Sequence, residues 1–314
     1  MSKKVAQPTP TPVNHTKLRI PAAPRSIQKG SSLGDLLDRD AIECLAHNIS
    51  LVFPKFDGDS FRRAALDGLK PLAILQRGQH LARALREHLP NCYEDAIDIL
   101  IHSLTPPMSQ TDDLGLAVFL YLPHVSFVAT YGLDAKGNGG RDPFEVSMKA
   151  QYELTRRFSA EFSMRPFLIR WPERTVARLM EWTRDADPHV RRLCSEGARP
   201  RLPWAMRIPA FVKDPTPVLP ILEALKDDED LYVRRSVANH IGDIAKDHPA
   251  LALDLRTLVD WRVCGAEVDD PSCSASPCEE GCEGGFAAAK ARGVIQPKAS
   301  LKFKSSAARR CCRG

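Results

Sequence analysis

Hydrophobic residues recur at helical spacing along this chain of 314 residues, beginning at Leu33. Prolines and glycines separate the successive runs, which is typical of helices joined by turns. No segment of any length alternates with the two-residue period of a strand, so the sequence predicts an all-α fold. The first run includes Leu36, Leu37, Ile42, Leu45 and Ile49, and further helices are predicted over residues 60–69, 71–88, 93–104 and 144–162.

One motif occurs twice in the second half of the chain. Asp187-Pro188-His189-Val190-Arg191-Arg192 is echoed by Asp230-Leu231-Tyr232-Val233-Arg234-Arg235, at an offset of 43 residues. A period in the low forties is typical of paired helices of the HEAT type, which stack into a solenoid with a concave face. Asp187 is also a favourable helix N-cap, and Pro188 suits the first helical position. The sequence therefore predicts a HEAT-like solenoid whose concave face is lined by arginine.

The pattern divides the chain into three parts. Residues 1–32 are rich in Pro, Ser, Thr and Lys and are predicted to be a disordered tail. Residues 33–261 form the predicted helical-repeat domain, and residues 262–314 form a divergent tail. No apolar run is long enough to span a membrane, and no apolar segment follows Lys3 and Lys4 as in a secretory signal, so we expect a cytoplasmic protein.

The positive charge of the chain is local. The formal net charge is +5, yet the body between residues 34 and 262 has 29 basic and 33 acidic residues. Within it, residues 156–207 contain twelve Arg and six Asp or Glu, and none of these basic residues is Lys. Because the planar guanidinium suits phosphate, this stretch indicates a polyanion-binding surface, although a solvated helix face would have the same composition.

Three carboxylates within or beside this arginine-rich region are the candidate catalytic groups. They are Glu161, Glu196 and Asp243. A carboxylate beside arginines is by default an ion-pair partner, and acids on a DNA-facing surface weaken phosphate binding. They become useful where positive charge develops on a sugar, as in cleavage of a glycosidic bond to a cationic base.

Trp204 and the cysteines are two further candidates for chemistry. Trp204 lies in a Pro-rich loop between the repeats, where its indole could stack on a sugar or base or pack in the core. The nine cysteines, six of them after Trp261, match no standard zinc spacing, so no metal is expected.

At these residues the sequence resembles the bacterial AlkC-type DNA alkylation repair glycosylases, which are relatives of AlkD. The resemblance runs from about Leu33 to Trp261. It is carried mainly by ELTRRFSAEFSMRPFL, HVRRLCSEGARPRLPWAMRIPAF and DPTPVLPILEALKDDEDLYVRRSVANHIGDIAKDHP. It implies a HEAT-like fold and release of 3-methyladenine and 3-methylcytosine from duplex DNA, without extrusion of the damaged base and without a cofactor. It also implies a monomer that associates with the bacterial nucleoid during repair.

The resemblance assigns roles to particular residues. Glu161, Glu196 and Asp243 would stabilise an oxocarbenium-like sugar and position water. Trp204 would pack against the deoxyribose of the lesion. The remaining DNA contacts would come from Arg165, Arg192, Arg199, Arg201, Arg234 and Asn239.

After Trp261 the resemblance stops abruptly. Reverse translation of residues 268–287, read one nucleotide late, permits WTIRHALRHLVKKGAKAAL, which resembles the segment that the family has there. We interpret residues 262–314 as the product of a one-nucleotide frameshift, with a genuine divergent tail as the alternative. The first interpretation predicts that this chain lacks its last basic helix and has impaired activity.

The main alternative function is a non-catalytic HEAT-repeat module that binds DNA or a protein. The three carboxylates discriminate between the hypotheses. Catalysis is favoured if they converge near Trp204 without Arg partners, and binding is favoured if an Arg neutralises each of them. A protein-binding scaffold would instead have an apolar concave face.

Overall fold

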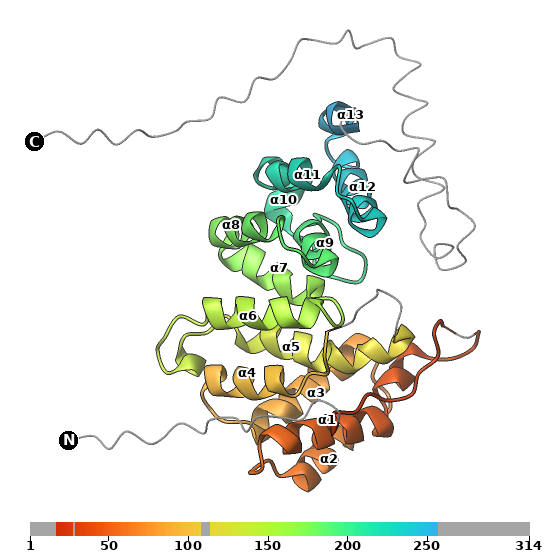
Figure 1. Cartoon of the computed structure of the whole chain (residues 1–314), viewed down its shortest axis with the longest axis vertical. Coiled ribbons are helices and arrows are strands. Elements are labelled where there is room, and N and C mark those ends of the chain that lie inside the picture. The colour runs from red at the N-terminus through yellow and green to blue at the C-terminus, as the bar shows by residue number, and fades with distance from the viewer. Residues whose placement is uncertain (1–16, 28, 108–113, 257–314) are drawn as a thin grey trace, which may run out of the picture. The chain divides into compact units, whose positions relative to one another are not determined.

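The structure is a computed structural model that describes residues 17–27, 29–107 and 114–256, all within one compact unit (Figure 1). The described residues contain helices and no strand, so the predicted all-α class is confirmed. The predicted tail at 262–314 lies outside them. The elements in chain order are η2 (Leu33–Leu37), α1 (Arg39–Val52), α2 (Gly58–Leu66), α3 (Ile74–His88), α4 (Tyr93–His102), η3 (Gly115–Tyr121), α5 (Leu122–Tyr131), η4 (Lys136–Asn138), α6 (Phe144–Thr155), α7 (Glu161–Arg170), α8 (Pro172–Trp182), α9 (Pro188–Glu196), α10 (Pro209–Lys213), η5 (Thr216–Val218), α11 (Leu219–Leu225), α12 (Leu231–Ala245) and α13 (Pro249–Arg256).

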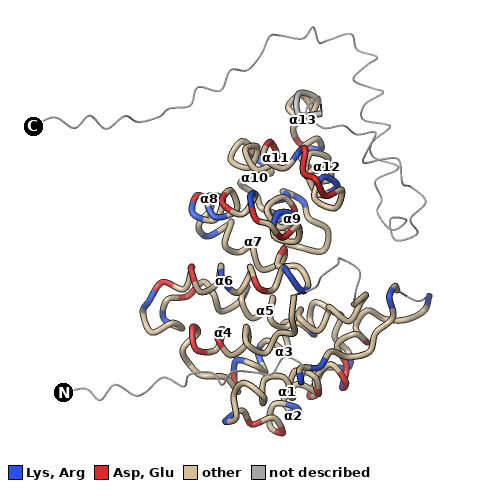
Figure 2. Tube along the Cα trace, viewed as in Figure 1, with Lys and Arg blue, Asp and Glu red and all other residues tan. Residues whose placement is uncertain are grey.

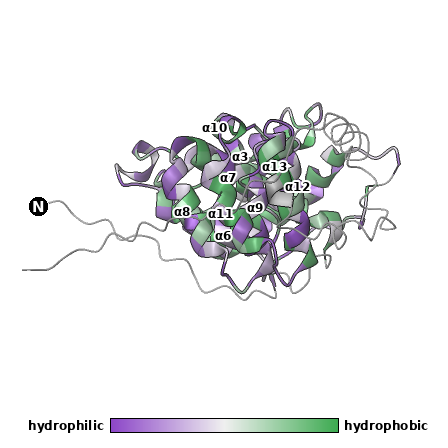
Figure 3. Cartoon of the chain, turned by 90° about the horizontal axis from the view of Figure 1, so that it is seen from above, coloured by the Kyte–Doolittle hydropathy of each residue, from purple (hydrophilic) through white to green (hydrophobic). Residues whose placement is uncertain are grey.

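The helices pack in successive layers. α3 contacts α5, α5 contacts α7, and α9 contacts α12, while α4 contacts α6 and α8 contacts α11 (Figure 1). Individual helices carry both hydrophobic and hydrophilic residues (Figure 3), which is what packing on one side and solvent on the other require. Neighbouring layers therefore share a continuous apolar core from Leu37 to Ala252. None of the described helices is long and apolar enough to cross a membrane.

The predicted helix over 144–162 is wrong in its length, and two helices occupy the region. The amides of Arg157 and Phe158 both donate to the carbonyl oxygen of Leu154, which closes α6 with a tight turn. α7 begins at Glu161, where the Ser159 hydroxyl donates to the Glu161 carboxylate over 2.9 Å. Glu161 therefore lies in the first turn of a new helix rather than at the end of a long one.

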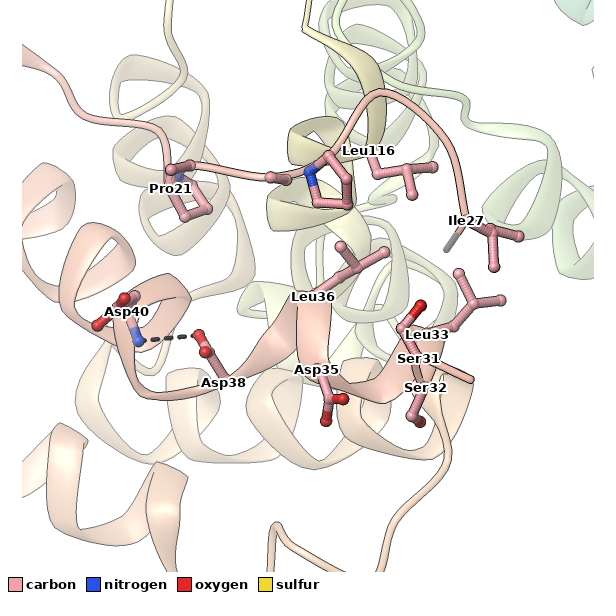
Figure 4. Close-up of a pocket in the computed structure, with 13 residues that line it drawn as sticks. Pro21, Ile27, Ser31, Ser32, Leu33, Asp35, Leu36, Asp38, Asp40 and Leu116 are labelled. Carbon is pink, nitrogen blue, oxygen red and sulfur yellow. Dashed lines mark hydrogen bonds between the residues drawn. The ribbon is translucent and has the colours of Figure 1, made fainter. Parts of the chain in front are cut away.

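Residues ahead of position 33, where the helical-repeat domain was predicted to begin, also contact the helices. The backbone N–H and C=O of Arg19 both bond to the side-chain amide of Asn48, over 2.8 Å each. Farther along, the Pro24 carbonyl accepts from the amide of Leu116. These side-chain and loop contacts hold a segment without apolar periodicity. Pro21, on this segment, also lines a cavity of about 170 Å³ (Figure 4), together with η2 and the acidic start of α1.

Two buried polar side chains in the N-terminal half differ in their hydrogen bonding. Arg77 on α3 is 8% exposed and donates to four backbone carbonyls, those of Gly34, Leu37, Lys70 and Leu72. His124 on α5 is 3% exposed, and neither ring nitrogen has a hydrogen-bond partner among the described residues. Arg77 is therefore satisfied, whereas His124 incurs the cost of an unpaired polar group.

Replacing His124 by Phe should raise the free energy of unfolding by about 1–3 kcal/mol at pH 7, because the unpaired nitrogens are removed. Burial lowers the pKa of His124 to about 4, so the unfolded chain binds this proton first as the pH falls below the ordinary value of about 6.5. Wild-type stability is then lost between those pH values, and the advantage of His124→Phe should be about 2 kcal/mol larger at pH 5. Urea unfolding at pH 7 and pH 5 measures both effects. An advantage that does not change with pH would contradict this account.

Candidate functional site

The repeated motif places equivalent arginines at equivalent helix starts. Asp187 caps α9 by accepting from the amide of His189 over 2.9 Å, and Asp230 precedes α12 in the same extended conformation. The Nη1 atoms of Arg191 and Arg234 each donate to the carbonyl oxygens five and six residues earlier. The repeat is thus reproduced at the level of hydrogen bonds. Arg234 was predicted to hold phosphate, but at least its Nη1 atom is bonded to its own backbone.

The first arginine of the motif also links the repeats. Arg191 donates to the Asp228 carboxylate through two nitrogens, over 2.7 and 3.0 Å, and to Asp230 over 2.7 Å. One layer earlier along the chain, Arg156 at the end of α6 donates to Asp187 over 2.9 Å. In both cases an arginine of one layer binds the acidic turn that begins a helix of the next layer.

The three candidate carboxylates converge on one cluster, although they come from α7, α9 and α12. Arg192 lies between Glu161 and Glu196, with N–O distances of 3.3 and 3.6 Å. Arg199 lies between Glu196 and Asp243, at 2.7 and 2.8 Å. The result is an alternating chain of three carboxylates and two guanidinium groups, and Figure 2 shows acidic and basic residues together on α9 and α12.

Glu196 is the central carboxylate of this chain. It is 5% exposed and accepts a hydrogen bond of 2.6 Å from the Ser236 hydroxyl. Burial opposes its ionisation, but Arg192 and Arg199, with the hydrogen bonds from Ser236 and Arg199, outweigh burial and hold the pKa of Glu196 below its usual value. Glu196 is therefore a carboxylate at neutral pH.

The two outer carboxylates differ in exposure. Asp243 is 2% exposed and has a second partner, the largely exposed Lys246, whose Nζ lies 3.0 Å from Oδ1. The Glu161 side chain is 15% exposed, and the contacts recorded for it within the described residues, from Arg192 and Ser159, use Oε2. Glu161 is thus the most accessible carboxylate of the cluster.

The three carboxylates converge, which the sequence analysis set as a condition for catalysis. However, each of them has an arginine partner, and such pairing was expected of a binding module. Three carboxylates face Arg192, Arg199 and the solvent-exposed Lys246, so their negative charge is largely balanced in the free protein. Sequence reasoning missed Ser236 and Lys246. It also missed Tyr232, whose ring centre lies 4.9 Å from the Arg192 guanidinium carbon.

The loop between α9 and α10 presents Trp204. Its side chain is 66% exposed, so the alternative of core packing is wrong. Its backbone has φ of 62°, a left-handed conformation that a non-glycine residue adopts only when its surroundings impose it. On the same loop, Arg201 forms a two-pronged ion pair with Asp247, over 2.7 Å through each nitrogen. The described residues thus place an exposed indole on a constrained loop.

Arg165 was predicted to contact DNA, but its side chain is buried in this structure and cannot do so directly. The residue is 0% exposed, and its guanidinium donates to backbone carbonyls of the same loop. Burial, together with the positive charge of Arg199, lowers the pKa of Arg165 to about 10, so it remains protonated at neutral pH. Asn239, by contrast, is exposed on α12, one turn before Asp243, where its amide can reach a ligand.

Comparison with known proteins shows what the whole chain is similar to. No protein-family model matches the chain. A solved structure of Pseudomonas fluorescens alkylpurine DNA glycosylase AlkC, bound to DNA containing an abasic site analogue, matches with a TM-score of 0.64 and 34% sequence identity, over 75% of this chain and 64% of that one. The chain is thus similar to AlkC in sequence and in fold. The uncharacterized protein YhaZ of Bacillus subtilis (strain 168) is 38% identical over 222 residues, which are 70% of this AlkC-like chain.

The match covers only part of both relatives. The AlkC-like chain spans 57% of YhaZ and 64% of the AlkC chain, less than two thirds of either. The resemblance read from the sequence motifs and the helical-repeat fold are nevertheless confirmed.

Proposed function

We propose that this AlkC-like chain is a DNA glycosylase that acts in base excision repair. It hydrolyses the N-glycosidic bond of N-alkylated bases, 3-methyladenine and 3-methylcytosine, in duplex DNA and does not extrude the damaged base. The observation that carries the proposal is the convergence of Glu161, Glu196 and Asp243, from three helices, in a chain related to a glycosylase that was solved with abasic DNA.

The chemistry fits a cluster of ionised carboxylates. An alkylated base is already cationic, so it can leave without being protonated, and positive charge develops on the sugar as the bond breaks. Carboxylates near the sugar lower the energy of that charge, and water then adds at the sugar carbon and loses a proton. The accessible Glu161 is suited to face the sugar. The buried Glu196 and Asp243 lie behind Glu161 and contribute their negative charge.

The arginine partners do not prevent this role when DNA is bound. Phosphates compete with carboxylates for guanidinium and ammonium groups, and the half-buried Arg192 and the exposed Lys246 are the accessible cations of the cluster. A phosphate that binds either cation withdraws positive charge from the carboxylates. DNA binding then increases the negative field at the sugar.

Release of methylated bases from duplex DNA tests the proposal. The chain should release 3-methyladenine or 3-methylcytosine, and it should release unmodified adenine about 10²- to 10⁴-fold more slowly, because a neutral base needs a proton that the cluster does not supply. The matched comparison is a version of the chain with the reading frame restored after Trp261. Activity of the restored version alone would attribute the loss to the altered tail.

A non-catalytic DNA-binding module is the second candidate, because every carboxylate of the cluster has an arginine partner. The two functions differ in one result. If both versions fold and bind duplex DNA but release no base, the binding module is the correct description.

A further inference from the structure

Arg165 lies one turn after Glu161 on α7, and its guanidinium reaches across to the loop that follows α9. Nη1 donates to the carbonyl oxygen of Arg199 over 2.7 Å and approaches that of Gly197 at 3.4 Å. Nη2 donates to Pro200 over 3.3 Å, and Nε donates to Met206. A single buried side chain thus holds both ends of the loop.

The contact at Arg199 connects Arg165 to the carboxylates. While Arg165 binds the backbone oxygen of Arg199, the side chain of Arg199 bridges Glu196 and Asp243 at 2.7 and 2.8 Å. A shift of the Arg199 backbone would therefore move the counterion of two carboxylates. On the other side, Arg165 binds carbonyls before and after Trp204, whose left-handed backbone needs such restraint.

We infer that Arg165 is a positioning residue, which orients the Arg199 bridge and the Trp204 loop relative to Glu161 on its own helix. This inference rests on the proposed glycosylase function. Arg165 contacts neither DNA nor the reacting sugar, and it acts only through the loop that it holds. The planar guanidinium suits this task because its five N–H donors are fixed in one plane, whereas lysine has a single head group.

The test compares single-turnover base release with DNA binding in Arg165→Met and Arg165→Lys. Misplacement of a site by about 1 Å can cost roughly 100-fold in rate, so we expect Arg165→Met to slow release of 3-methyladenine by about 100-fold. The dissociation constant for DNA with an abasic-site analogue should change by less than about threefold, since the DNA-contacting groups remain. Arg165→Lys should recover part of the rate. It replaces Arg165→Met as the test variant if Arg165→Met does not fold.

Arg77→Met is the matched control, because Arg77 is also buried and also binds four carbonyls, but in the N-terminal helices. It should lose stability while its folded fraction releases base at the wild-type rate. Base release at the wild-type rate in folded Arg165→Met would overturn the inference. So would equal losses of rate and DNA affinity, which indicate general disruption of the site.

A readout independent of activity separates this inference from the proposed function. Trypsin cleavage after Arg201 and Arg207, followed by mass spectrometry, reports the freedom of the loop. We expect the Arg165 variants to be cleaved there at least about tenfold faster than wild type and Arg77→Met. If neither the wild type nor the version with the restored reading frame releases base, the proposed function fails, and this cleavage pattern alone decides the role of Arg165: faster cleavage supports it, and unchanged cleavage overturns it.

Discussion

Glu196→Gln should slow the release of 3-methyladenine by about 10²- to 10³-fold, the range expected when one preorganised electrostatic group is removed. Glutamine keeps the shape of the side chain and can still accept from Ser236, but it lacks the negative charge that stabilises the sugar cation. Affinity for duplex DNA should be retained or should increase, because Arg192 and Arg199 are released from a carboxylate partner. Single-turnover release and equilibrium binding measure the two effects, and Asp243→Asn should behave in the same way.

Glu153→Gln is the control for this prediction. Glu153 is also paired with an arginine, Arg157 at 2.7 Å, but it is half-buried rather than buried and lies outside the cluster. It should leave the release rate unchanged. Comparable losses of release and DNA affinity in Glu196→Gln would mean that Glu196 orders the structure rather than taking part in catalysis.

Arg199→Met should lower the free energy of unfolding by about 3–5 kcal/mol at pH 7, because it leaves two buried carboxylates without their shared counterion. The pKa of Glu196 is lowered in the folded wild type, so its ion pairs stabilise the fold above the unfolded pKa of about 4.3. That contribution is lost as the pH falls through the folded pKa. The stability difference between wild type and Arg199→Met should therefore narrow below pH 4, which urea unfolding at pH 7 and pH 3 would measure.

Arg174→Met provides the comparison with an exposed arginine. Arg174 pairs with Asp142 and Glu145, but its side chain is 42% exposed, and such surface pairs contribute about 0–1 kcal/mol. A loss in Arg199→Met no larger than that in Arg174→Met would show that the carboxylates tolerate the interior without their bridge.

The repeat was accessible from the sequence for a physical reason, because Asp187 and Asp230 mark equivalent helix starts. The convergence of the carboxylates was implied only by the family resemblance, since Glu196 and Asp243 do not occupy equivalent positions of the repeat. The role of Arg165 was not accessible, because an arginine that binds phosphate and one that binds buried carbonyls look the same in a sequence. Only the structure distinguishes the two roles, because it shows the Arg165 side chain buried beneath the loop.

The contacts made ahead of residue 33 and the end of α6 were not visible in the sequence for a related reason. Apolar periodicity reports the faces that pack, and the segment from residue 17 is held instead by backbone hydrogen bonds to Asn48. The end of α6 at Thr155 likewise depends on a turn closed by backbone amides and on Arg157 bonding to Glu153. Contacts of this kind involve polar groups that a hydrophobic pattern does not record.

The links from Arg156 to Asp187 and from Arg191 to Asp228 and Asp230 run in one direction along the chain. At both joints the earlier layer supplies the cation and the later layer supplies the acidic turn, so the two joints are alike but the array is not symmetric. A whole unit of 43 residues carrying both halves of the joint could be inserted or deleted with its connections intact. A partial unit would leave an acidic turn or an arginine unmatched, which favours growth and shortening of such proteins by complete repeats.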